Sequence, residues 1–146
     1  MPHDHYGDAD IRSILSSVKT IAMLGASPNP ARPSNRVLRF LLSQGYTVYP
    51  VNPGHAGSEI HGAKVYRSLA DVPSPVDMVD VFRNSGFVAG IVDEALAITP
   101  RPKVIWTQLD VYDEKAAAKA EAAGVKMVMD RCPAIEIPRL GISARR

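Results

Sequence analysis

The feature that most limits how this chain can fold is a regular alternation of short, unbroken apolar runs with amphipathic helical segments. The run at residues 20–24, for example, shows no alternation of polar and apolar side chains and ends at Gly25. Such a run suits a strand that is covered on both faces of a parallel sheet. Strands that alternate with helices along one chain predict βαβ units.

Periodicity and turn residues give the bounds of the expected elements. We predict helices over residues 8–18, 34–44, 86–98 and 114–123, the second of them capped by Ser34. We predict strands over 20–24, 46–51, 64–66, 76–82, 104–106 and 125–129, with 64–66 at an edge. With right-handed crossovers, this series predicts an α/β fold: a doubly wound, Rossmann-like parallel sheet of order 3-2-1-4-5-6.

Length and composition favour one ordinary globular domain over residues 1–146, with residues 1–7 and 141–146 flexible. The net charge of +2, from 17 basic and 15 acidic residues, predicts no nucleic-acid partner. A lone cysteine fits a reducing cytoplasm. No apolar run is long enough for a membrane span, and the start does not resemble a signal peptide. We therefore expect a cytoplasmic protein without a membrane partner.

The predicted strand order places a ligand crevice at the switch point between the first and fourth strands. The chain there reads Gly25-Ala26-Ser27 after the first strand and Phe82-Arg83-Asn84 after the fourth. Ligands of open parallel sheets bind in this position, at the carboxyl ends of the strands.

The loop after the first strand contains parts suited to an anion, but not the G-x-G-x-x-G fingerprint of dinucleotide-binding proteins. Ser27 offers a hydroxyl, Arg32 can form paired hydrogen bonds to phosphate, and the helix beginning at Ser34 offers free amides and a positive dipole end. The alternative is a turn with a serine cap and an exposed arginine.

The ends of the later strands leave alternatives open. Asn52 stands where nicotinamide-dinucleotide enzymes usually carry an acid for the ribose, although Asn52-Pro53-Gly54 could be only a turn. Arg83 could bind phosphate, or it could pair with Asp80 or with an acid at the surface. Trp106 is favoured as a core residue because tryptophan is highly buried on average.

No catalytic or metal-binding group is predicted. Cys132 lacks a histidine that the sequence would bring near it, so we interpret it as a buried structural thiol. The histidines and carboxylates do not have the spacing of a metal site.

Several motifs in one order resemble a known family. They are Gly25-Ala26-Ser27, Arg32-Pro33-Ser34, Tyr49-Pro50-Val51-Asn52-Pro53, Val81-Phe82-Arg83, Trp106-Thr107-Gln108 and Met129-Asp130-Arg131-Cys132-Pro133. Over residues 11–140 the chain is similar to the small stand-alone CoA-binding proteins of bacteria and archaea. These resemble the N-terminal domain of the succinyl-CoA synthetase α subunit.

The resemblance implies a binding site for coenzyme A (CoA) or an acyl-CoA. It places the pyrophosphate at Gly25, Ala26 and Ser27 and at the helix start with Arg32, Ser34 and Asn35. It places the adenosine at Val51, Asn52 and Pro53, and the pantetheine arm beside Phe82, Arg83, Trp106, Thr107 and Gln108. Two departures stand out: Gly54-His55 replaces a lysine of the synthetase domain near the CoA 3′-phosphate, and Asp110 replaces a glycine.

We therefore expect a domain that binds CoA without catalysis of its own, and whose protein partner the sequence does not specify. The alternatives are an NAD(P)-linked or acyl-CoA-using enzyme and a regulatory protein that senses CoA.

Overall fold

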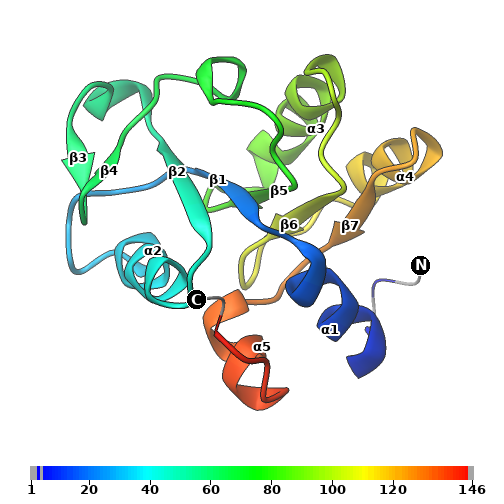
Figure 1. Ribbon diagram of the computed structural model, residues 1–146. Coiled ribbons are helices and arrows are strands. Elements are labelled where there is room, and N and C mark those ends of the chain that lie inside the picture. Colours follow the sequence, from blue (N-terminus) through cyan, green and yellow to red (C-terminus); the bar gives the residue numbers. More distant parts are fainter. Residues whose placement is uncertain (1–2, 4, 145–146) are drawn as a thin grey trace.

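The computed structural model describes residue 3 and residues 5–144, and these form one α/β unit around a parallel sheet. Its strands lie in the order β2 (Thr47–Val51), β1 (Thr20–Leu24), β5 (Met78–Val81), β6 (Val104–Thr107) and β7 (Lys126–Val128). All four neighbouring pairs are parallel. The predicted α/β, doubly wound architecture is confirmed, with the first strand beside the fourth of the expected series (Figure 1).

The predicted edge strand at residues 64–66 is not a full strand. Residues 59–64 instead form a small antiparallel hairpin of β3 (Glu59–Ile60) and β4 (Ala63–Lys64), and Tyr66 makes a single parallel bridge to Val51. The Tyr66 amide donates to Pro50, and the Asn52 amide donates to Tyr66. The next bond of the ladder would need an N–H on Pro50, which proline lacks. Pro50 therefore stops the third strand after one bridge.

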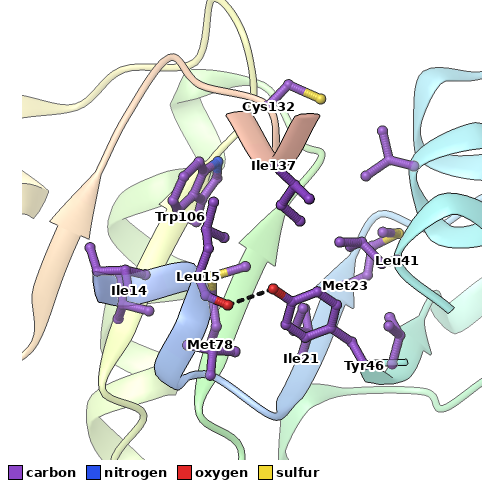
Figure 2. Close-up of a cluster of buried hydrophobic side chains, with 14 of the residues drawn as sticks. Ile14, Leu15, Ile21, Met23, Leu41, Tyr46, Met78, Trp106, Cys132 and Ile137 are labelled. Carbon is purple, nitrogen blue, oxygen red and sulfur yellow. Dashed lines mark hydrogen bonds between the residues drawn. The ribbon is translucent and has the colours of Figure 1, made fainter. Parts of the chain in front are cut away.

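One face of the sheet is covered by α1 (Asp8–Ser17), α2 (Pro33–Ser43) and α5 (Pro133–Arg139). Figure 2 shows part of this core, in which Trp106 lies between side chains of the helices and the sheet. The Tyr46 hydroxyl donates a hydrogen bond to the carbonyl of Leu15. This bond joins the residue just before β2 to the last part of α1.

The opposite face is covered by α3 (Val88–Ala97) and α4 (Glu114–Ala122). The contact side of α4 consists of Ala116, Ala117 and Ala120, all of them buried. Helices on both faces explain why the strands lack an alternation of polar and apolar residues. Three short 3₁₀ segments, η1 (Pro53–His55), η2 (Leu69–Asp71) and η3 (Ser85–Phe87), follow strand or bridge segments.

Helix α5 was absent from the sequence prediction. It begins at Pro133, a favoured residue for the first helical position, and Pro138 lies inside its last turn. Seven residues with an internal proline give too weak a periodic signal to be recognised as a helix.

The N-terminal segment packs against the end of β7. Tyr6 is buried, and its hydroxyl accepts a hydrogen bond of 2.8 Å from the Met129 amide. His3 bonds to the same hydroxyl and to Glu121. The flexibility of residues 1–7 and 141–146 stays a prediction, and residues 1, 2, 4, 145 and 146, which include the two closing arginines, lie outside the described residues. Within residue 3 and residues 5–144, no helix has the length and hydropathy of a membrane span.

Candidate functional site

Gly25 sits where the ends of three strands converge. Its amide donates to the carbonyl of Val51 at the end of β2, and its φ of +83° lies in the left-handed region that favours glycine. A Cβ atom at this position would lie 2.3 Å from the carbonyl oxygen of Phe82, just beyond β5. Any larger residue would therefore force β1 and β5 apart.

The loop between β1 and α2 is held by side chains of the first turn of α2. The Ser27 amide donates to Ser34 Oγ at 3.1 Å, and Asn35 Nδ2 donates to the Ser27 carbonyl at 3.0 Å. Ser34 is thus not the helix cap that the sequence predicted. Arg32 is the N-cap residue, because Pro33 occupies the first helical position, and Ser34 Oγ turns back toward the loop.

Asn52 joins the ends of β1 and β2. Its Nδ2 donates to the Ala26 carbonyl at 2.8 Å, and its Oδ1 accepts from the Gly54 amide at 2.9 Å. Asn52 thus makes the predicted turn and also lines the crevice, and a contact with a ligand stays a prediction. An ionised aspartate could not donate to Ala26, so the amide is needed for this geometry.

Two arginines at the site have no carboxylate partner in the part of the chain that the structure describes. Arg83 has its guanidinium carbon 4.0 Å from the centroid of the Phe87 ring, a cation–π arrangement. Neither Arg83 nor Arg32 forms an ion pair with a residue that the structure describes. The alternative pairing of Arg83 with Asp80 does not occur, because Asp80 is fully buried and has no hydrogen-bond partner among the described residues.

These elements surround a pocket of about 430 Å³ at the switch point, which we call the central pocket. Among the described residues its charged side chains are two arginines, so it favours an anion. Its lining consists of Gly25, Ser27, Arg32, Pro33, Ser34, Asn52, Phe82, Arg83, Asn84, Gln108 and Val111.

Two further pockets adjoin the central pocket. The side pocket, of about 310 Å³, shares Gly25 and Arg83 with it and also involves Leu24, Val51, Pro53, Arg67, Ser68, Leu69, Gly86, Phe87, Gly90, Ile91 and Glu94. The apolar pocket, of about 600 Å³, shares Pro33 and Gln108 with it and also involves Arg36, Val37, Phe40, Leu109, Asp110, Cys132, Ala134 and Ile135. Because the side pocket and the apolar pocket each share lining residues with the central pocket, we call the three together the trough.

The structure brings most of the predicted site residues to this trough. Gly25, Ser27, Arg32, Ser34, Asn52, Phe82, Arg83 and Gln108 line the central pocket, and Val51 and Pro53 line the side pocket. Sequence reasoning missed Arg67 and Ser68, which follow a segment without a recognisable phosphate-binding motif. It also missed the apolar residues around Cys132, since their elements are far apart in the sequence.

Four predicted residues do not line the three pockets. Trp106 is fully buried, which confirms its interpretation as a core residue. Its indole N–H donates to the Arg131 carbonyl at 2.9 Å. Thr107 donates its hydroxyl to the Val111 carbonyl. Ala26 and Asn35 are also buried, and Asn35 acts through its bond to Ser27.

Cys132 is a buried free thiol at the edge of the apolar pocket. No hydrogen bond from it to a base is found among the described residues. In the part of the chain that the structure describes, no group of three or more histidine, cysteine or acidic side chains is placed to hold a metal ion.

Comparison with known proteins identifies the family. Residues 19–138 match the model of a family described as a CoA binding domain. The chain belongs to this family. This chain is 36% identical over 124 residues to the uncharacterized protein YneT of Bacillus subtilis. The match covers 85% of this chain and 89% of YneT. The chain also resembles a solved hypothetical protein from Pyrococcus horikoshii, with 41% identity, a TM-score of 0.87 and 96% of each chain covered.

Part of the chain is also similar to a stretch of a larger enzyme subunit. The α subunit of an ADP-forming acetate–CoA ligase of Pyrococcus furiosus is 33% identical over 84 residues, which are 55% of this chain. The match spans only 18% of that subunit. The likeness to the ligase is therefore confined to one domain of it.

The two departures from the family pattern have structural outcomes. His55 is exposed in η1 and does not line the trough. Asp110 has a φ of +66°, which explains why glycine suits this position, and the residue is part of the lining of the apolar pocket. Its amide donates to Asp130 Oδ1 at 2.8 Å.

Proposed function

We propose that this CoA-binding domain binds CoA or an acyl-CoA reversibly in the trough and carries out no catalysis itself. The observation that carries the proposal is the central pocket. It is bounded by a glycine that no other residue can replace without a clash, by the start of α2, and by two arginines that pair with no carboxylate among the described residues. This arrangement is suited to a diphosphate.

Each part of the central pocket has a role in holding the diphosphate. Pro33 has no N–H and the Asn35 amide donates to the Arg32 carbonyl at 3.1 Å, so in the first three positions of α2 the Ser34 amide is the donor left for an anion. Arg32 can form two parallel hydrogen bonds to a phosphate, and Arg83 adds a second positive charge from the segment after β5. Ser27 supplies a hydroxyl from a loop that Ser34 and Asn35 already hold in place. A preformed loop lowers the entropic cost of binding.

The two ends of the ligand would lie in opposite directions from the diphosphate. The adenosine would extend into the side pocket, where Val51 and Pro53 are found. The pantetheine arm would pass Phe82 and Gln108 toward the apolar pocket. Gln108 has a buried Oε1 without a hydrogen-bond partner among the described residues, and the amides of the pantetheine arm could donate to it.

The absence of catalysis is proposed from the chemistry of the trough lining. No histidine lines any of its three pockets, and the Cys132 thiol has no hydrogen-bonded base among the described residues. A cysteine nucleophile needs such a base or another means of lowering its pKa.

Calorimetric titration of the purified protein with CoA and acetyl-CoA tests the proposal directly. We expect saturable binding of both, and an increase in the melting temperature because the ligand binds only the folded state. Absence of heat and of a thermal shift at saturating ligand would refute the proposed function. Titration with NADH and NADPH distinguishes the dinucleotide alternative, for which we expect no binding.

Arg32→Ala is the matching substitution. Removing the guanidinium should weaken CoA binding by roughly 1–3 kcal/mol, because a charge-assisted hydrogen bond to phosphate is lost. Arg12→Ala, which removes an equal charge from α1 away from the trough, is the control. Equal affinities for Arg32→Ala and the control would remove Arg32 from the site.

A further inference from the structure

We propose that the side pocket is a second anion subsite in which Arg67 binds the 3′-phosphate of CoA, so that the protein distinguishes CoA from dephospho-CoA. The inference depends on the proposed function. It assigns a specific group of the ligand to a residue that no sequence motif indicated.

The backbone before Arg67 is held against the end of β2. Tyr66 forms two backbone hydrogen bonds, each of 2.9 Å. Its amide donates to the Pro50 carbonyl, and its carbonyl accepts from the Asn52 amide. Arg67 therefore follows directly from the point where the chain crosses the edge of the sheet. The short bridge places it in the same pocket as Val51 and Pro53.

The guanidinium of Arg67 is available to a ligand. Its side chain is exposed, and it forms no ion pair or hydrogen bond with a residue in the described part of the chain. The nearby acid Asp71 instead accepts a hydrogen bond of 3.0 Å from the Ser68 hydroxyl. Glu94 on α3 is the acid in the lining of the side pocket.

The charges of the trough match a ligand with two separate anionic groups. Arg32 lines only the central pocket, Arg67 lines only the side pocket, and Arg83 lines both. Stacking on Phe87 holds Arg83 at the boundary between them. CoA carries a diphosphate and, on the ribose beside the adenine, a separate phosphate monoester. A diphosphate in the central pocket leaves the monoester to the side pocket, where Arg67 is the additional cation.

The test compares CoA with dephospho-CoA, which lacks only the 3′-phosphate, by calorimetry on the full-length protein. We expect the unmodified protein to bind CoA at least about tenfold more tightly than dephospho-CoA, because only CoA can form the charge-assisted hydrogen bond between Arg67 and the 3′-phosphate. In Arg67→Ala the two ligands should bind with nearly equal affinity, and dephospho-CoA should bind as in the unmodified protein. Arg67→Lys, which restores a cation, should recover part of the preference.

Arg32→Ala and Arg12→Ala are the matched comparisons. Arg32→Ala should weaken both ligands by the same factor, since both carry the diphosphate, and Arg12→Ala should change neither. An equal loss of both ligands in Arg67→Ala, or no preference for CoA in the unmodified protein, would overturn the assignment of Arg67 and leave the proposed function standing. Binding of neither ligand to the unmodified protein would overturn the proposed function and this inference with it.

Discussion

Asp80 lies on β5, the central strand, between Met23 of β1 and Trp106 of β6. The residue is fully buried, and neither carboxyl oxygen has a hydrogen-bond partner among the described residues. Burial disfavours the charged form and raises the pKa of Asp80 to about 8. The carboxyl group is therefore mostly protonated in the folded protein at neutral pH.

This residue should make stability depend on pH. In the unfolded chain Asp80 loses its proton near its ordinary pKa of 3.8, whereas the folded protein keeps it to about pH 8. Between these values the folded state binds one more proton, so the free energy of unfolding falls by about 1.4 kcal/mol per pH unit. Asp80→Asn should remove this slope in urea denaturation between pH 5 and pH 7.5.

Asp93→Asn is the control for Asp80→Asn, since Asp93 is an exposed carboxylate that pairs with Lys119 at the surface. It should retain the slope of the unmodified protein. An Asp80→Asn protein with an unchanged slope would show that Asp80 is ionised in the fold.

At the scale of the element, α4 illustrates how one side chain determines where a helix begins. Asp113 is its N-cap residue, and Asp113 Oδ1 accepts a hydrogen bond of 3.0 Å from the Ala116 amide. Most of the helix is alanine on its buried side, so little side-chain packing holds its first turn. The cap therefore contributes a substantial share of the local stability.

Asp113→Ala should lower the free energy of unfolding by about 1 kcal/mol, because the Ala116 amide loses its acceptor. Chemical denaturation measures the change. Lys115→Ala, at an exposed position of the same helix, should have little effect because alanine favours the helix. Similar stabilities for the two variants would contradict a capping role for Asp113.

At the scale of the whole molecule, Tyr6 connects the N-terminal segment to a strand end 123 residues away in sequence. Its ring is buried, and the guanidinium carbon of Arg131 lies 5.0 Å from the ring centroid. Burial is the first cause of the raised pKa of the Tyr6 hydroxyl. The segment before α1 thus closes the end of the sheet at β7.

Tyr6→Phe should destabilise the protein by roughly 1–3 kcal/mol, because the buried Met129 amide then lacks an acceptor while the ring remains. Tyr112→Phe is the matched control, since the Tyr112 hydroxyl bonds to Asp130 at an exposed site. Thermal denaturation and proteolysis of the N-terminal segment measure both. Equal melting temperatures would indicate that the Tyr6 hydroxyl does not hold the segment.

The sequence by itself determined the five strands of the parallel sheet, the helices α1 to α4 and the place of the crevice. Unbroken apolar runs can be satisfied only between two helical layers, and Gly25 follows such a run where the chain must turn sharply and approach its neighbours. The central pocket could be predicted for the same reason, since in a parallel sheet the ends of β1 and β5 lie side by side. These features depend on local chemistry and on the rules of strand order.

Only the tertiary structure decided which side chains line the trough. Trp106 and Gln108 are two residues apart, yet one is buried in the core and the other lines the trough. Pro50 cannot donate to a neighbouring strand, so the third strand ends after one bridge and Arg67 follows at the edge of the side pocket. That pocket combines residues from four separate segments of the chain, whose spacing is set by packing across the sheet and not by any local pattern.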